Sequence, residues 1–505
     1  MARSTTDSFF RGLRAASTAA AIVWGSSVGH AASLDVTGIE KGSDLYDAVL
    51  GGSLLREQTA EDATPSTQEL LAAAQADYAR LLAVLYDQGY FAPVIKITVD
   101  GVDVSSIAPV SPPKQINKAV INIQPGKKFS FAKAEITPVA PGTELPEGFA
   151  VGQPARLGIL KDTVAKAITG WRDQGHAKAA LTDQQLTARA PDSTISATLR
   201  LDPGPRLRFG ELTVKGESAV RRNRINKIAG LPTGQVYSQE QLDLAATRLR
   251  RTGAFSSVAM IEADQITAPD ILPITAQIAD APQRRFGFGA ELSSLEGLSV
   301  SSYWMHRNLF GGAENLRVEG EISGIGGSSG GTDYRLSTRF ERPATFNADT
   351  NFYAFAEIEQ LDEEFYFSRQ FDIEAGIERI ASAERTYTSG VGLRTAETRD
   401  AFGTQNYTLL TLPLTAEHDY RDNRLDAKDG FYAKASVTPF LAISGSANGV
   451  RSYVDLRGYK TFGTTRPVTF ALRGQLGSVY GPTLSQSPAD YLFYSGGGGS
   501  VRGQP

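Results

Sequence analysis

Few residues in this sequence could carry chemistry. The chain contains no cysteine and only four histidines, His30, His176, His306 and His418, with no paired spacing among them. The lack of thiols excludes disulfides, thiolate metal sites and a cysteine nucleophile, and scattered histidines argue against a histidine-based metal site or triad. We therefore predict that the protein is not an enzyme and has no catalytic residue, no metal site and no cofactor.

Two glycine-rich segments and one acidic run remain as candidate binding sites. The segment "SGIGGSSGGTDY" (residues 323–334) lacks both the Lys-Ser/Thr pair of a phosphate-binding loop and a following helix, so it predicts a flexible hairpin loop. The acidic run "LDEEFYF" (residues 361–367) predicts a solvated turn. The other glycine-rich segment, "SGGGGSVRGQP" (residues 495–505), places a single arginine after four glycines.

The beginning of the sequence indicates export. Arg3, Arg11 and Arg14 precede a short stretch of small apolar residues that ends at Gly29-His30-Ala31. This pattern is typical of a secretory signal peptide, which we assign to residues 1–31. The remaining sequence has no apolar run near the ~18–20 residues that a membrane-spanning helix needs. A net charge of −4 gives no reason to expect a nucleic-acid partner.

One pattern recurs three times between residues 34 and 283. In each copy a helix ends in a glycine, namely Gly89, Gly175 or Gly253, and an extended segment follows. Two of the three predicted helices begin with a capping box, Ser66 to Glu69 and Ser238 to Gln241. Strand-like segments flank a Pro-Gly pair at each internal boundary. The order strand, helix, helix, strand, strand predicts small α+β modules in tandem.

The boundaries of these modules follow from the Pro-Gly pairs. We assign the first module to residues 32–127, the second to 128–205 and the third to 206–283. A three-stranded sheet that is covered by helices on one face exposes an edge strand, which can accept an extended peptide through main-chain hydrogen bonds. The alternative is that the modules are passive spacers.

The pattern changes at residue 284, where apolar and polar residues begin to alternate. We predict about eleven strands, near residues 286–294, 298–308, 313–323, 333–342, 350–360, 369–381, 386–397, 405–419, 430–442, 449–462 and 467–481. A soluble sandwich would alternate as well. Long strands, ionisable residues on the polar face and aromatic residues near strand ends favour an antiparallel transmembrane β-barrel over residues 284–505.

Three stretches, together with the tandem modules, resemble the outer-membrane assembly-factor superfamily, in which polypeptide-transport-associated (POTRA) domains precede a surface-antigen barrel. They are "HRNLFGG" (residues 306–312), "EHDYRDNRLDAKDGFY" (417–432) and "GGGGSVRGQP" (496–505). The matching residues are His306, Arg307, Asn308, Gly311, Gly312, Asp419, Arg421, Asp422, Gly430, Val501, Arg502 and Gly503. Gln504 departs from the family, which often has an aromatic residue there.

The resemblance implies a sixteen-stranded barrel whose sixth outer loop folds back into the lumen, where Arg502 pairs with carboxylates on later strands. Only about eleven strands are present, so we expect the sequence to be truncated at its C-terminus.

The family's function is outer-membrane protein assembly or translocation, in which client proteins of the autotransporter type are inserted or secreted. Three modules indicate the translocation-and-assembly-module branch, which implies an inner-membrane-anchored partner of the TamB type. Unfolded outer-membrane clients and outer-membrane lipid are the other expected partners. The expected location is the bacterial outer membrane, with the POTRA domains in the periplasm. The alternatives are a two-partner secretion pore, or a passive channel or structural barrel with periplasmic spacer domains.

Overall fold

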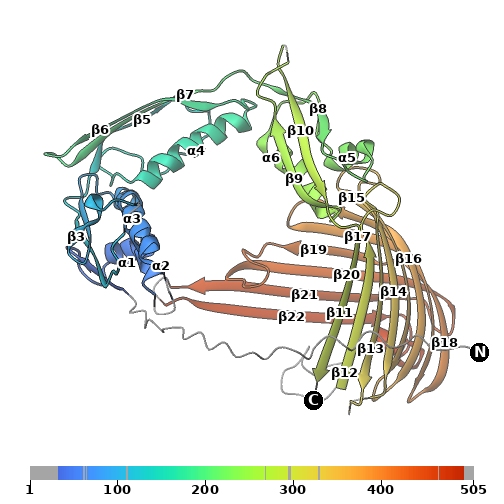
Figure 1. Ribbon diagram of the computed structural model, residues 1–505. Coiled ribbons are helices and arrows are strands. Elements are labelled where there is room, and N and C mark those ends of the chain that lie inside the picture. Colours follow the sequence, from blue (N-terminus) through green and yellow to red (C-terminus); the bar gives the residue numbers. More distant parts are fainter. Residues whose placement is uncertain are drawn as a thin grey trace, which may run out of the picture. The chain divides into compact units, whose positions relative to one another are not determined.

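The computed structural model describes residues 32–60, 63, 65–109, 112–267, 269–293, 297–327, 330–463 and 466–493. The predicted signal peptide and the Val501 to Gly503 motif lie outside these residues. The chain forms two compact units, Met1–Ile168 with Leu181–Asp202, and Thr169–Ala180 with Pro203–Pro505. Figure 1 labels the elements of both. In the described parts of the chain, no helix is long and apolar enough to span a membrane.

The first unit opens with a four-stranded mixed sheet in the order β1-β4-β2-β3. Its strands are β1 (Ser33–Thr37), β2 (Val94–Val99), β3 (Val102–Asp103) and β4 (Lys118–Gln124), and its helices are α1 (Asp44–Gly52), α2 (Leu54–Gln58), α3 (Thr67–Asp87) and the short η1 (Val104–Ser106). The capping box of α3 forms as predicted, with Ser66 and Glu69 bonded reciprocally. Leu81 and Leu85 of α3 share one apolar core with Ile97 and Ile121 of the sheet.

A second sheet follows in the order β5-β7-β6. It consists of β5 (Ser130–Thr137), β6 (Ala180–Arg189) and β7 (Thr194–Asp202), with the single helix α4 (Leu157–Asp173). The prediction of two helices in this module is wrong. The segment 141–155, which is fully described, forms turns instead, because its three prolines and three glycines oppose helix formation.

The second unit contains a third small sheet in the order β8-β10-β9. It is built from β8 (Arg208–Lys215), α5 (Arg222–Ala229), α6 (Gln239–Arg251), β9 (Phe255–Glu262) and β10 (Ile271–Asp280), in the predicted order of elements. Its core joins Phe209, Leu249 and Ile274, and it also takes in Ala313 and Ala344 from turns of the large sheet that follows.

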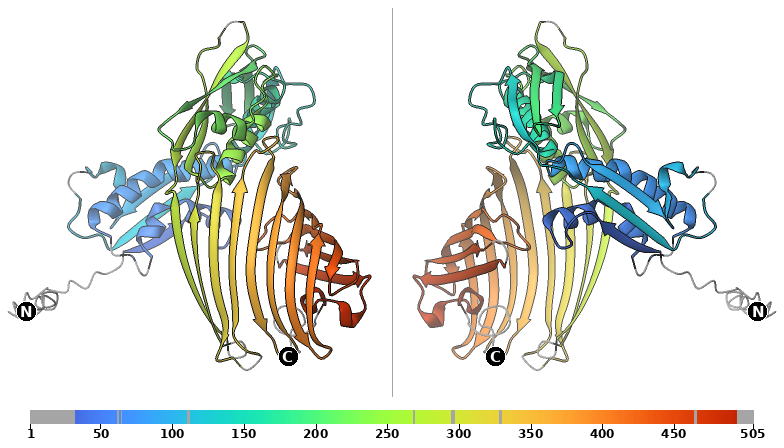
Figure 2. Two further views of the ribbon diagram at one scale, coloured as in Figure 1. Left: turned by 90° about the vertical axis from the view of Figure 1, so that its right-hand side faces the viewer. Right: turned by 90° about the vertical axis from the view of Figure 1, so that its left-hand side faces the viewer.

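The large sheet has twelve assigned strands in the described residues, β11 to β22, and Figure 2 shows it as a curved wall. The strands are β11 (Arg284–Ser293), β12 (Gly297–His306), β13 (Asn315–Ile325), β14 (Asp333–Arg342), β15 (Thr350–Asp362), β16 (Phe367–Ile380), β17 (Arg385–Asp400), β18 (Gly403–Thr411), β19 (Leu414–Asp419), β20 (Asp429–Ser444), β21 (Gly449–Phe462) and β22 (Val468–Tyr480). Neighbouring strands pair antiparallel throughout these residues, from Arg284↔His306 in the first pair to Phe462↔Val468 in the last.

One predicted strand is interrupted. The segment 405–419 forms β18 and β19, which both pair with β17 and β20 and are separated by Leu412 and Pro413. The register with β17 is the same on both sides of the break, from Gly392↔Thr411 to Ser389↔Leu414. Proline has no backbone N–H to donate to a neighbouring strand, so the ladder stops there and resumes.

Apolar and charged residues alternate along the strands of the large sheet, so its two faces differ in character, as predicted. On β16, Phe371 and Ile373 are exposed on one face, while Asp372 and Glu374 lie on the other. On β22, Phe470 and Leu472 share a face that Arg473 does not. An apolar face and a charged face are what a wall between lipid and a wet lumen requires.

The glycines at the predicted helix ends adopt the conformations that glycine favours. Gly89, Gly175 and Gly253 have φ of +90°, +100° and +68°, and they follow α3, α4 and α6. A Cβ at Gly175 would lie 2.6 Å from Val236 Cγ1, whereas a Cβ at Gly253 would meet nothing within 4 Å. Gly175 and Gly253 can therefore be compared directly. Both have a positive φ, but an added Cβ would meet neighbouring atoms only at Gly175.

We predict that Gly253→Ala lowers the local free energy of unfolding by about 1–2 kcal/mol through left-handed strain alone. Gly175→Ala should cost roughly 1–2 kcal/mol more, because Val236 must also move. Hydrogen exchange of the full chain in detergent, read at the ends of α4 and α6, measures both. Equal losses at the two helix ends would show that the contact with Val236 is unimportant.

Candidate functional site

The third small sheet is joined to the large one by a charged contact. Asp349, in the turn between β14 and β15, accepts a hydrogen bond from Arg248 Nε at 2.8 Å and one from Arg251 at 3.2 Å. Arg248 also donates to the carbonyls of Ala229 and Gly230. Burial opposes ionisation of Asp349, but the hydrogen bonds and charges of Arg248 and Arg251 outweigh it, so the pKa of Asp349 is lowered. The contact is therefore a fully charged pair at neutral pH.

Main-chain atoms complete this joint. Arg221 N donates to the carbonyl of Gly311 at 2.9 Å, and Lys227 Nζ donates to that of Thr345 at 3.0 Å. Ala313 and Ala344 from the same two turns are 2% and 0% exposed and belong to the core around α5 and α6. The third module and the large sheet are thus one packed body, and a force on the module reaches the wall directly.

The predicted motif of residues 306–312 forms part of this joint. His306 ends β12, and Arg307 donates to the carbonyl of Pro282 at 2.9 Å. Asn308 Oδ1 accepts a hydrogen bond from Ala313 N at 2.9 Å, which closes the turn that contains Gly311 and Gly312. A Cβ at Gly312 would fall 2.3 Å from a carboxylate oxygen of Glu314. The motif therefore forms a turn that contacts Arg221, the residue that precedes α5.

The second predicted motif closes the hairpin between β19 and β20. Arg421 binds Asp419 through two parallel hydrogen bonds of 2.8 and 2.9 Å. Asp422 accepts backbone hydrogen bonds from Lys428 and Asp429, which lower its pKa. Gly430 has φ of +99°, and a Cβ there would lie 2.1 Å from the carbonyl oxygen of Tyr420. These residues form a hydrogen-bonded turn at a different hairpin from that of the first motif.

The segment 484–493, which precedes the predicted Val-Arg-Gly motif, lies on the charged face of the wall. It contains the short helices η2 (Leu484–Gln486) and η3 (Ala489–Tyr491). Arg394 of β17 binds Asp490 of this segment and also Gln370, and its Nε lies 3.8 Å from Asp372. We call residues 484–493 the lumen segment, because the face that it covers is the charged one.

Aromatic residues hold the lumen segment along several strands. The ring of Tyr491 lies 5.4 Å from that of Phe440, and the guanidinium of Arg394 lies 5.0 Å from the Tyr491 ring. Phe493 stacks on Tyr453 at 6.0 Å. Further hydrogen bonds come from Arg451 to the carbonyl of Tyr491, from Tyr407 to that of Ser487 and from Gln405 to that of Ser485. The segment is thus fixed to β17, β18, β20 and β21.

Sequence reasoning missed both the lumen segment and the joint at Asp349. Arg394 and Asp490 lie 96 positions apart, and Arg248 and Asp349 lie 101 apart. The only signal in the sequence was the presence of Arg394 at a position on the charged face of its strand. Arg502, which the resemblance places in the lumen, lies outside the described residues.

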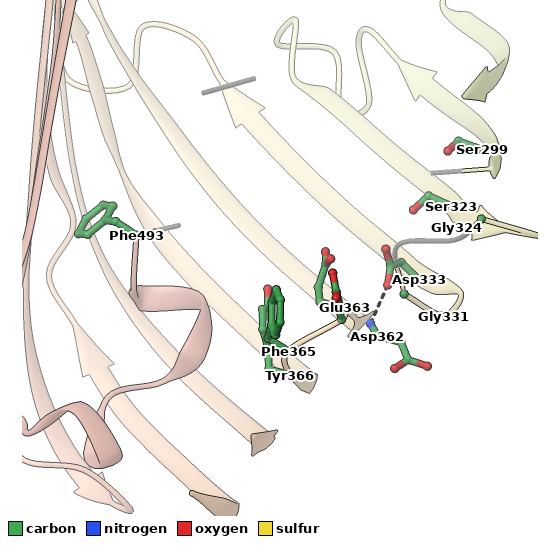
Figure 3. A pocket seen from close by; sticks show the side chains of 13 residues that line it. Ser299, Ser323, Gly324, Gly331, Asp333, Asp362, Glu363, Phe365, Tyr366 and Phe493 are labelled. Atoms are coloured by element: carbon green, nitrogen blue, oxygen red, sulfur yellow. Dashed lines mark hydrogen bonds between the residues drawn. The ribbon is translucent and has the colours of Figure 1, made fainter. Parts of the chain in front are cut away.

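Figure 3 shows a cavity of about 700 Å³. Its lining residues Asp362 and Glu363 lie at the end of β15 opposite to the turn that contains Asp349. The cavity is lined by the predicted acidic turn, including Asp362, Glu363 and Phe365, and by Phe493 of the lumen segment. Asp362 N donates to Asp333 Oδ1 at 2.7 Å. Within the described ranges there is no cluster of side chains that could hold a metal ion. Four carboxylates, those of Asp333, Asp362, Glu363 and Glu364, line the cavity.

We predict that Asp349→Asn loosens the joint by about 2–3 kcal/mol, because it leaves Arg248, whose side chain is 9% exposed, without its charged partner. The pKa of Asp349 is lowered, so the contribution of this pair is complete above the ordinary carboxyl pKa of about 4 and is lost as the pH falls through the lowered value. Hydrogen exchange of residues 343–349 should show protection at pH 5 and pH 7 in the unaltered protein and less at both in the variant.

Asp426→Asn is the matched control, because its ion pair with Lys428 is exposed at the surface. It should change exchange at residues 343–349 by a negligible amount. A similar response to both substitutions would contradict the assigned role of Asp349.

The comparisons with known proteins agree with this architecture. An Omp85 superfamily domain matches residues 308–504, and the POTRA family, described as a surface antigen variable number repeat, matches residues 207–278. A search of curated proteins returns no match.

Among solved structures, BamA from Haemophilus ducreyi lacking POTRA domains 1–3 is similar, with a TM-score of 0.56 and 16% identity over 74% of this chain and 75% of that chain. CdiB from Acinetobacter baumannii has a TM-score of 0.45 and 10% identity over 74% and 72% of the two chains. POTRA domains 3–5 of Haemophilus influenzae BamA have a TM-score of 0.37 and 17% identity over 50% and 96%. The first of these shows a shared fold.

The domain order and the family matches fix the location of the protein. An Omp85-type barrel lies in the outer membrane, and the POTRA domain that precedes it lies in the periplasm. The turns that contact the third module therefore mark the periplasmic end of the wall, and the cavity in Figure 3 marks the outer end. The chain thus contains a POTRA domain at residues 207–278, followed by an Omp85 superfamily domain at residues 308–504.

Proposed function

We propose that this protein is an outer-membrane assembly factor that inserts or secretes client proteins together with a periplasmic partner, without enzymatic activity. The α+β modules engage extended segments of the client or partner, and the barrel domain then admits the client to the membrane. This role agrees with the superfamily and with the packed joint between the third module and the wall.

The main observation in support of the proposal is a sheet edge, β6, that pairs with a strand on one side only within the part of the chain that the structure describes. In the sheet β5-β7-β6, the β5 edge is covered, because Phe131 exchanges main-chain hydrogen bonds with Gln153 and Gly152. The opposite edge, β6, is ten residues long and exposed at nearly every position. An exposed edge of this length offers unpaired N–H and C=O groups to an extended peptide.

The third module repeats this asymmetry. Its β8 edge is covered by the segment 234–237, since Phe209 accepts from Gly234 N and donates to Gln235 O. Its other edge, β9, pairs only with β10 in the described residues. In both modules one edge of the sheet is covered, and the opposite edge, β6 or β9, is left for a partner.

The lumen segment supports an assembly role over a passive channel. A passive channel needs an unobstructed interior, whereas residues 484–493 are held on the charged face by Arg394 and by contacts between aromatic rings. Arg502, which follows this segment, would be held in the lumen as well, as the family resemblance implies.

The partner follows from the resemblance. Three predicted modules, over residues 32–127, 128–205 and 206–283, fit TamA, the barrel subunit of the translocation and assembly module, and imply an inner-membrane-anchored subunit of the TamB type. Unfolded outer-membrane proteins are the proposed clients.

Photo-crosslinking from β6 tests the function. A photoreactive residue at Gln184 or Gln185 in cells should capture an unfolded outer-membrane protein or the TamB-type partner. The control is the same residue at Lys161, which is exposed on α4 away from the edge. Capture of one secreted partner alone would favour a two-partner secretion pore, and equal capture from Lys161 would exclude recognition through the edge.

Conductance tests the role of the lumen segment. We predict that Asp490→Asn raises the conductance of the protein in planar bilayers, because the charged contact with Arg394 is lost. Asp372→Asn is the matched control, since it removes the other carboxylate near Arg394 without altering the segment. A large, steady conductance that neither substitution nor deletion of residues 34–283 changes would instead indicate a passive channel.

A further inference from the structure

The face of the wall opposite the lumen segment has a regular composition at its outer end. Register neighbours across seven strands form a row, which runs from β12 to β18 through Ser302, Gly320, Leu336, Ile358, Phe371, Thr395 and Thr408. Three large apolar side chains stand in the middle of the row, with small residues on both sides. The composition predicts a ridge between two hollows.

Both hollows are present. One has a volume of about 530 Å³ and is lined by Ser302, Gly320 and Leu336, among others. A Cβ at Gly320 would meet nothing within 4 Å, so the space above this glycine is open. The other hollow, of about 430 Å³, is lined by Phe371, Thr395 and Thr408. Arg369 borders both hollows.

Two arginines lie between the ridge and the outer end of the wall. Arg369 occupies the next row towards the outer end, and Arg399 pairs with Phe367 one row further. Their guanidinium carbons lie 5.9 and 4.9 Å from the centre of the same Phe367 ring. The ring therefore holds the two cations over one side of the wall.

These two arginines differ from most arginines on the charged face. On that face, Arg317, Arg335, Arg339, Arg394, Arg457 and Arg473 all form ion pairs. Neither Arg369 nor Arg399 has an ion pair with any described carboxylate, although Glu397 stands opposite Arg369 in the ladder. The side chain of Arg369 donates to Gln360, a neutral acceptor, at 3.1 Å. The pair thus retains the capacity to bind an anion.

The depth of Arg369 matches a lipid headgroup. Along β16 the same face carries Arg369 at one end, then Phe371, Ile373, Ala375 and Ile377, and Arg379 at the other end. The ten steps from Arg369 to Arg379, at about 3.3 Å each, span roughly 33 Å, which a strand tilt of about 40° reduces to roughly 25 Å. This equals the apolar band of an outer-membrane barrel. Arg369 therefore lies at the outer border of the hydrocarbon.

We propose that this surface binds a phosphate-bearing lipid of the outer leaflet. Arg369 and Arg399 hold the phosphate, and acyl chains lie in the hollows at Gly320 and at Thr395, on either side of the ridge. Charge complementarity selects the headgroup, and the paired hollows select a lipid with several chains. This inference depends on the location of the barrel domain and not on the proposed assembly function.

Native mass spectrometry of the detergent-solubilised full chain with diphosphorylated, six-chain lipid A tests the proposal. Arg369→Ala and Arg399→Ala should each weaken binding about fivefold, and the double variant about thirtyfold. Glu397→Gln should strengthen binding, because it removes the negative charge opposite Arg369. Arg379→Ala, at the periplasmic border of the same strand, should leave binding unchanged.

A second pair of variants tests the hollow. Gly320→Leu should weaken binding by filling the space above the glycine. Gly458→Leu is the matched control, because a Cβ at Gly458 on β21 would also meet nothing within 4 Å, while this glycine borders neither hollow. Heat stability in detergent checks that each variant is folded.

Three results would overturn the proposal. Equal losses from Arg369→Ala and Arg379→Ala would mean a non-specific effect of charge. Equal binding of phosphatidylcholine and lipid A would mean that the arginines do not select the headgroup. Competition by inorganic phosphate at concentrations close to those of the lipid would mean an anion site without a lipid component.

Discussion

The large sheet must satisfy two solvents at once, and the rest of the structure depends on this constraint. Strand residues alternate between hydrocarbon and a wet interior, so each change of register by one residue would reverse the faces. Antiparallel pairing preserves the alternation from β11 to β22. Charged side chains on the inner face find partners on neighbouring strands, as Arg457 and Arg473 do at Asp455.

The turns at the periplasmic end of the wall are packed against the third module. The contact combines two arginines on Asp349 with two buried alanines and several main-chain hydrogen bonds. Hydrogen bonds fix the orientation of the turns, and burial of the two alanines adds apolar contact. The sheet that contains β9 is therefore packed directly against the membrane domain.

The sequence predicted the features that depend on local pattern. Alternation identified the faces of β16 and β22, and glycine positions identified the ends of α3, α4 and α6. Two local predictions were wrong where proline intervened, in the segment 141–155 and at Pro413. Contacts between distant positions, such as Arg394 with Asp490, were missed because no period in the sequence reports them. The role of Arg502 and the module boundaries stay predictions.

The break at Pro413 has a mechanical consequence for the wall. Between β18 and β19, Leu412 donates to the carbonyl of Pro439, and the carbonyl of Pro413 accepts from Gly390, but Pro413 has no proton to give in return. Pro439 on β20 is opposite Leu412 and has no proton to return that bond, so the ladder lacks a hydrogen bond on both sides of this point. A sheet bends most easily where hydrogen bonds between its strands are missing. The curvature of this wall will therefore change near Leu412 and Pro413 before it changes at the periplasmic or the outer end.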